Sequence, residues 1–140
     1  MSYRFLDHTA DIAAEFEAET LGGLYGEALA AFTDTLTVRE RVEPAVEREF
    51  ELAAADREAL LVDWLDELLY AWEVDRLLFR DAEVEVEEGA GGVRLAARAR
   101  GERYDPDRHP VKVLIKGVTW HGLTVERAGG GWRGRVIFDI

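Results

Sequence analysis

The segment LLVDWLDELLYAW (residues 60–72) carries the strongest structural pattern in this sequence. Its apolar residues recur at steps of one, three and four, which is the spacing of an amphipathic α-helix. The carboxylates of Asp63, Asp66 and Glu67 fall on the opposite side, and Asp56 stands at an N-cap position. We expect this helix to be the spine of the hydrophobic core, with a buried face made of Leu60, Leu61, Trp64, Leu65, Leu68, Leu69 and Trp72.

A second amphipathic helix is predicted upstream, at residues 21–36, where apolar residues again recur at helical spacing. Thr20 stands at its N-cap position. Three glycines lie early in this helix, but neither a following Lys-Ser/Thr pair nor a GxGxxG pattern supports a phosphate-binding loop. We therefore expect that close helix packing is the role of Gly22, Gly23 and Gly26.

The remaining segments predict β-strands, because apolar and polar residues alternate along them, and residues 89–92 form a glycine-rich hairpin turn. Strands with two inserted helices, followed by a run of strands, predict an α+β fold. We expect a single domain over residues 1–140, with the two amphipathic helices packed on a mixed or antiparallel β-sheet. The predicted strands are residues 3–6, 11–18, 46–54, 82–88, 93–102, 111–120, 123–126 and 133–140.

Composition limits the possible classes of function. The chain has 140 residues, 48% of them hydrophobic, and a formal net charge of −12. This charge repels phosphate backbones and anionic lipid, so we expect no strong direct binding of nucleic acid. An acidic surface can bind a basic protein partner, and it can equally do no more than keep a protein soluble.

The absence of cysteine limits the possible metal ligands. Any metal ion must be held by oxygen and imidazole ligands, which favours hard cations.

The sequence also predicts where the protein acts. Its first residues, MSYRFLDHTA, lack the basic start and the apolar run of a signal peptide. No apolar stretch approaches the roughly 18 residues of a membrane span. We therefore expect a cytoplasmic protein with no membrane partner.

Polar residues that can carry chemistry gather at three strand ends: residues 7–11 (DHTAD), residues 116–122 (KGVTWHG) and the final Asp139 and Ile140. If the last strand pairs with the strand that begins at Asp11, the carboxylates of Asp11 and Asp139 converge with the α-carboxylate of Ile140. Like charges so close together need a cation, and calcium, magnesium and manganese all favour oxygen ligands. The pattern therefore points to a site for a hard divalent cation.

An ordinary structural role is open for each of these residues. Asp11 can serve only as a turn residue that binds local backbone N–H groups. His8 and His121 are of a type that more often makes turn hydrogen bonds than metal bonds. Lys116 by default is a lysine that faces solvent from its strand.

Catalytic motifs do not support an enzyme. The sequence has no GxSxG, HExxH or GxxxxGK[ST] motif and no cysteine nucleophile. Asp11, Asp139 and His8 leave one alternative open, a stand-alone metal-dependent hydrolase of phosphate esters. A scaffold protein that binds its partners through acidic surface is a third possibility.

Four segments together resemble the archease family, in order and at similar spacing over nearly the whole chain. They are FLDHTADI (residues 5–12), LVDWLDELLY (61–70), VKVLIKGVTWHGLTV (111–125) and the terminal IFDI (137–140). The sequence departs from the family pattern at Ala13, commonly glycine, at Gly117, commonly alanine, and at Trp120, commonly tyrosine. The charged positions are intact.

This resemblance implies a protein that is not itself an enzyme. Archeases are protein cofactors of the manganese- and GTP-dependent RNA ligase that joins tRNA exons, and they promote guanylylation and multiple turnover of that ligase. The resemblance implies a calcium-type metal site at Asp11, Asp139 and Ile140, where magnesium or manganese is also possible. It assigns activation of the ligase to Lys116, Asp139 and Asp11, with possible support from His8 and His121.

Overall fold

The computed structural model describes residues 2–6 and 11–140, and its elements follow the predicted order. Both predicted helices are present, together with strands in all the segments for which strands were predicted apart from residues 111–116. The elements are β1 (Ser2–Leu6), β2 (Asp11–Ala18), α1 (Leu21–Leu36), the 3-10 helix η1 (Arg39–Arg41), β3 (Val46–Ala54), α2 (Arg57–Asp75), β4 (Leu77–Gly89), β5 (Gly92–Arg103), β6 (Gly117–Ala128) and β7 (Gly131–Asp139).

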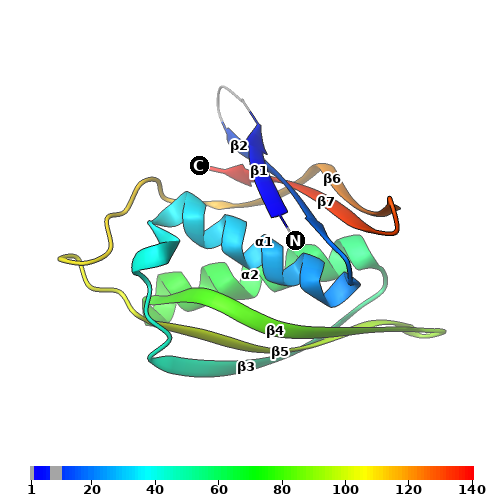
Figure 1. The fold of residues 1–140 in the computed structure, drawn as a ribbon, viewed down its shortest axis with the longest axis horizontal. Helices are drawn as coiled ribbons and strands as arrows, with labels where there is room; N and C mark the ends of the chain where they lie inside the picture. Colours follow the sequence, from blue (N-terminus) through cyan, green and yellow to red (C-terminus); the bar gives the residue numbers. More distant parts are fainter. Residues whose placement is uncertain (1, 7–10) are drawn as a thin grey trace.

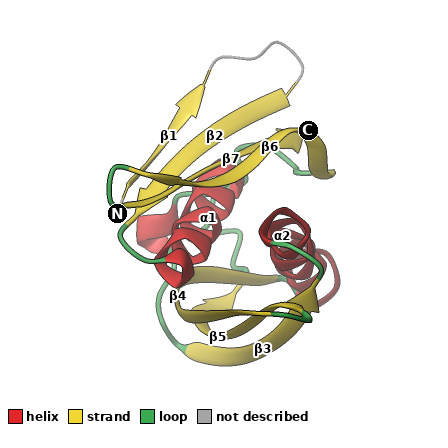
Figure 2. Ribbon diagram, turned by 90° about the vertical axis from the view of Figure 1, so that its right-hand side faces the viewer, coloured by secondary structure: helices red, strands yellow, loops and turns green. Residues whose placement is uncertain are grey.

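The strands form two sheets, and the two helices lie between them (Figures 1 and 2). One sheet has the order β1-β2-β7-β6 and the other the order β3-β5-β4, and every strand pair is antiparallel. Helix α1 contacts β2 and β4, and α2 contacts β6 and β3, so each helix is covered on two sides. The predicted α+β class is confirmed. The strands form two sheets, and the two helices lie between these sheets.

The two helices begin at the predicted caps. The Thr20 hydroxyl accepts a hydrogen bond from the Gly23 N–H at 3.0 Å, and the Asp56 carboxylate accepts one from the Ala59 N–H at 2.8 Å. These bonds satisfy backbone donors that a helix start otherwise leaves without a partner. Helix α2 ends where Arg76 turns into the left-handed region, with φ of 53°.

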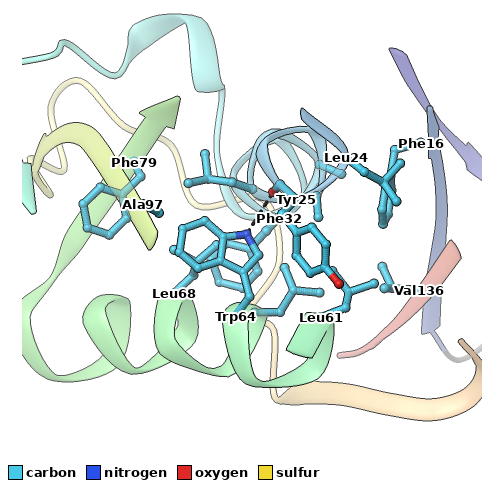
Figure 3. Packing of buried hydrophobic residues seen from close by; sticks show 14 of the residues in the cluster. Phe16, Leu24, Tyr25, Phe32, Leu61, Trp64, Leu68, Phe79, Ala97 and Val136 are labelled. Atoms are coloured by element: carbon cyan, nitrogen blue, oxygen red, sulfur yellow. Dashed lines mark hydrogen bonds between the residues drawn. The ribbon is translucent and has the colours of Figure 1, made fainter. Parts of the chain in front are cut away.

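The hydrophobic core is centred on the predicted face of α2, all of which is buried (Figure 3). The indole of Trp64 lies fully inside it and donates a hydrogen bond to the Tyr25 carbonyl of α1 at 2.9 Å. Phe50 of β3 packs edge-on against Trp64, with ring centroids 5.3 Å apart. The core thus joins both helices to the β3-β5-β4 sheet.

Of the early glycines of α1, Gly22 makes the close packing that the sequence predicts. A Cβ atom on Gly22 would lie 2.1 Å from the Val84 carbonyl oxygen of β4, a distance that no side chain tolerates. At Gly26 the same atom would lie 3.6 Å from the Ala82 oxygen. Helix α1 therefore approaches β4 more closely at Gly22 than at Gly26.

Residues 111–116 were predicted as part of a strand, and this prediction is wrong. Strand β6 begins only at Gly117, and it continues through the predicted gap before residue 123 with an irregular register between Thr119 and Thr124. Before β6, the Lys112 N–H donates to the Leu36 carbonyl at 2.8 Å, and Ile115 is buried. The segment is held to the end of α1 and buries Ile115, while Val111 and Leu114 are exposed.

No helix in the described part of the chain is both long enough and apolar enough to cross a membrane.

Candidate functional site at the carboxyl end of β7

Three segments that are far apart in the sequence meet at the end of β7 (Figure 1). Strand β7 lies between β2 and β6, and Asp139 is opposite Asp11 on one side and Gly117 on the other. The Lys116 N–H donates to the Asp139 carbonyl at 2.7 Å. The expected pairing of the last strand with the strand that begins at Asp11 is therefore confirmed.

Asp11 and Asp139 project from the same face of their sheet. Residues directly opposite in an antiparallel pair have Cβ atoms about 4.5–5.5 Å apart and share a face. The neighbouring Phe138 is fully buried and packs against Phe32 of α1, so the Asp139 side chain faces away from the helices. Asp139 is exposed, so its side chain is open to a ligand or a partner, whereas Asp11 is half-buried.

The two carboxylates supply only oxygen donors, which suits a hard cation such as calcium, magnesium or manganese. Within residues 2–6 and 11–140, no group of three or more His, Cys, Asp or Glu side chains is placed to hold a metal ion. A metal at Asp11 and Asp139 therefore needs further oxygen ligands, from the Ile140 carboxylate, water or a bound partner.

Lys116 is exposed at this end of the sheet. The chain has 17 basic residues but only two lysines, Lys112 and Lys116, and both lie in the segment that leads into β6. In the ion pairs between described side chains, the basic partner is arginine in every case except the pair of His109 with Glu102. A lysine ammonium is a compact point charge on a flexible stem, which suits contact with a phosphate or a developing negative charge.

His121 lies in the irregular part of β6. Its N–H donates to the Thr119 hydroxyl at 2.9 Å, and Gly122 follows it with φ of 71°. Trp120 is 59% exposed at the same place, close in sequence to Lys116. His8, the other histidine of the predicted site, lies outside the described residues.

The sequence analysis did not single out a buried polar cluster in the loop between β5 and β6. His109 is completely buried, and its Nε2 lies 2.7 Å from Glu102 Oε1. Arg108 donates to the other Glu102 oxygen at 2.8 Å, and the Glu43 backbone N–H donates to Oε1 at 3.1 Å. The only sequence signal was the segment YDPDRHP (residues 104–110), in which a histidine follows an arginine between two prolines.

Electrostatics keep Glu102 ionised in this cluster. Burial is the largest influence and raises the pKa of Glu102, but hydrogen bonds from Arg108, from the Glu43 N–H and from His109 together lower it to about 2. The carboxylate is thus charged at neutral pH while almost wholly removed from solvent. Such a group requires all its partners, since losing one would leave a buried charge incompletely paired.

Together, fold and site define a class of protein: a two-sheet α+β protein with an exposed polar site at one end. A model of the archease protein family matches residues 3–140. The archease of Methanosarcina mazei is 41% identical over 99% of this chain and 95% of its own length, and that of Methanopyrus kandleri is 40% identical over 100% of both chains. The chain belongs to the archease family.

Solved structures agree with this assignment. The solution structure of a Methanobacterium thermoautotrophicum protein has a TM-score of 0.84 and 31% identity, covering 99% of this chain and 98% of that one. The crystal structure of a Thermotoga maritima archease, described as a possible chaperone, has a TM-score of 0.60 and 20% identity, covering 96% of this chain and 94% of that one. The second likeness supports the fold alone.

Proposed function

We propose that this protein is a non-enzymatic activator of the manganese- and GTP-dependent RNA ligase that joins tRNA exons and repairs RNA in the cytoplasm. The observation that carries the proposal is the pairing of Asp11 with Asp139 beside Lys116. The residues expected to act in ligase activation come from three separate segments and share one exposed end of a sheet. The ligase itself is what the family resemblance implies.

The described residues of the site offer the chemistry of an accessory group. Asp11 and Asp139 would hold a divalent cation together with the Ile140 carboxylate, and the bound cation would supply positive charge beside a triphosphate. Lys116 would contact the nucleotide and offset negative charge that develops during nucleotidyl transfer. Its backbone bond to the Asp139 carbonyl keeps the two residues together as the site docks.

Charge supports a basic protein partner. The net charge of −12 disfavours direct contact with an RNA backbone. A ligase that binds RNA and nucleotide offers basic surface near its active site, which an acidic protein complements. The Thermotoga maritima relative is described as a possible chaperone, a role that also acts through contact with another protein.

Multiple-turnover RNA joining by the cognate ligase, with manganese and GTP, tests the proposal. We expect catalytic amounts of the protein to raise the rate, and the Asp139→Ala and Lys116→Gln variants to lose most of this effect. Glu17→Ala is the matched control, because Glu17 lies on the same face of β2 but at the other end of the sheet, paired with Arg133 at 3.0 Å.

The alternatives give different results. A stand-alone hydrolase would turn over phosphate esters without the ligase, whereas an activator alone gives no turnover. A stimulation that is equal for the parent and for both site variants would exclude this site as the activating surface. No stimulation by the parent would reject the proposed function.

A further inference from the structure

The loop between β5 and β6, residues 104–116, has no regular secondary structure. Because the loop ends at Lys116, its path determines the position of that residue. It is attached to the rest of the protein at widely separated points. The Tyr104 N–H donates to the Arg76 carbonyl at 2.7 Å, the Lys112 N–H to Leu36 at 2.8 Å, and the Lys116 N–H to Asp139 at 2.7 Å. These three attachments are backbone bonds, which specify no particular side chain.

The attachment in the middle of the loop is made by side chains. Glu102, at the end of β5, accepts hydrogen bonds from both Arg108 and His109 of the loop. Arg108 also donates to the Arg41 carbonyl at 2.9 Å, which ties the loop to η1. We call Glu102, Arg108 and His109 the loop anchor. It joins the loop to β5 through the Glu102 carboxylate and to η1 through the Arg108 guanidinium.

His109 has one defined partner on each ring nitrogen. Its Nδ1 accepts the Asp105 N–H at 2.9 Å, so the proton lies on Nε2 and points to Glu102. The Asp105 carbonyl in turn accepts the His109 N–H at 2.8 Å. The ring therefore closes a tight turn on one side and holds that turn to β5 on the other.

We propose that the loop anchor is a positioning device for Lys116: the paired Glu102 and His109 hold the loop so that Lys116 lies beside Asp139. Only six residues separate His109 from Lys116, and they include Pro110, whose φ is fixed, and Ile115, which is buried. A shift of the anchored turn therefore passes along a short and stiff segment. The effect on ligase activation rests on the proposed function, whereas the effect on the loop does not.

Two substitutions separate the two bonds of His109. An asparagine amide reaches approximately the position of Nδ1 and can still accept the Asp105 N–H, while a glutamine amide reaches that of Nε2 and can still donate to Glu102. We expect His109→Asn and His109→Gln each to loosen the loop. Glu88→Gln is the matched control, because Glu88 forms a two-bond pair with Arg57 at 2.7 and 3.1 Å away from this loop.

Amide hydrogen exchange by NMR measures the loop directly. We expect protection of the Lys116 N–H to fall by at least about tenfold in the His109 variants, with protection of the α2 amides retained. A merely structural role would lower the protection of Lys116 and α2 together, as expected for any loss of global stability. Unchanged Lys116 protection in a folded His109 variant, or an equal loss in Glu88→Gln, would overturn the proposal.

Ligase stimulation is the second measurement. The maximal stimulated rate should fall by about tenfold or more in His109→Gln, because a small displacement of a positioning group is costly in catalysis. The Glu88→Gln control should keep the parent rate. If the parent protein does not stimulate the ligase, the proposed function fails, and the exchange experiment still decides whether the loop anchor positions Lys116.

Discussion

Asp139 has two roles at the scale of a single residue. Its carbonyl accepts the Lys116 N–H, and its side chain remains exposed opposite Asp11. Because the first contact is made by the backbone, substitutions of the Asp139 side chain leave it intact. The chemistry of the site can therefore be changed without disturbing the pairing of β7 with its neighbours.

Asp11 and Asp139 should together bind a divalent cation. We expect calorimetric titration with manganese or calcium to show binding to the parent, and Asp11→Asn and Asp139→Asn each to weaken it at least about tenfold, because each removes a charged oxygen ligand. Glu17→Gln should bind like the parent. Equal affinities for all four proteins would show that the ion binds elsewhere.

Glu102 gives a prediction about pH. Its pKa is lowered from 4.5 to about 2 in the folded protein, so its contribution to stability is complete above about pH 4.5 and is lost as the pH falls toward 2. We expect urea unfolding to show that Glu102→Gln is less stable than the parent by roughly 1–3 kcal/mol at pH 7. The difference should shrink by pH 3, and a difference that does not change with pH would contradict this account.

The sequence could predict part of the site at this scale. Asp11 and Asp139 were predicted to meet because the strands that carry them were expected to pair, which they do. Lys116 fell inside the predicted strand 111–120, and its role came from the family resemblance. His109 was not predicted, because both of its ring partners depend on how the loop folds back on β5. A buried histidine between two prolines has no periodic signal that distinguishes it from an exposed one.

The helices show which elements the sequence could predict. Their periodicity and caps are local, and the bonds of Thr20 and Asp56 formed as expected. Residues 111–116 alternate as a strand does, yet their attachments are to the end of α1 and to β7, which are distant in the sequence. The division of the strands into two sheets likewise depends on which face each helix covers, and a strand pattern carries no such information.

Glycines in two strands give a prediction at the scale of elements. Gly101 of β5 lies opposite an irregularity in β4, and a Cβ there would be 1.8 Å from the Leu78 carbonyl oxygen. We expect Gly101→Ala to destabilise the protein by roughly 3 kcal/mol or more, because the clash is with backbone. At Gly117 nothing lies within 4 Å of such an atom, so Gly117→Ala should be neutral or stabilising by up to about 1 kcal/mol.

Thermal and urea unfolding of these two variants provides the measurement. Gly117→Ala is an informative control because it lies beside the candidate site and should also retain ligase stimulation. A destabilised Gly117→Ala, or a Gly101→Ala variant as stable as the parent, would show that the strands approach one another differently.

At the scale of the whole molecule, charge and site have separate roles. The chain has a net charge of −12. Acidic residues are numerous on the outer face of the β3-β5-β4 sheet, where Arg98 and Arg100 pair with Glu47, Asp81 and other carboxylates. The candidate site lies on the other sheet, at the end of β7. Under the proposed function, long-range attraction to a basic partner would come from the whole surface and activation from one end.

Salt should separate these two contributions. Raising NaCl from about 50 to about 500 mM should slow association with the ligase by tenfold or more, since attraction between exposed charges is screened over a few ångströms at high salt. Asp139→Ala should show nearly the same dependence on salt as the parent, because it removes one charge of many, while its stimulated rate at saturation is lost. Stopped-flow mixing measures the association rate, and steady-state RNA joining measures the stimulated rate at saturation. A scaffold that acts only through its acidic surface would keep full stimulation in Asp139→Ala. That result would assign the function to the acidic surface as a whole and not to the end of β7.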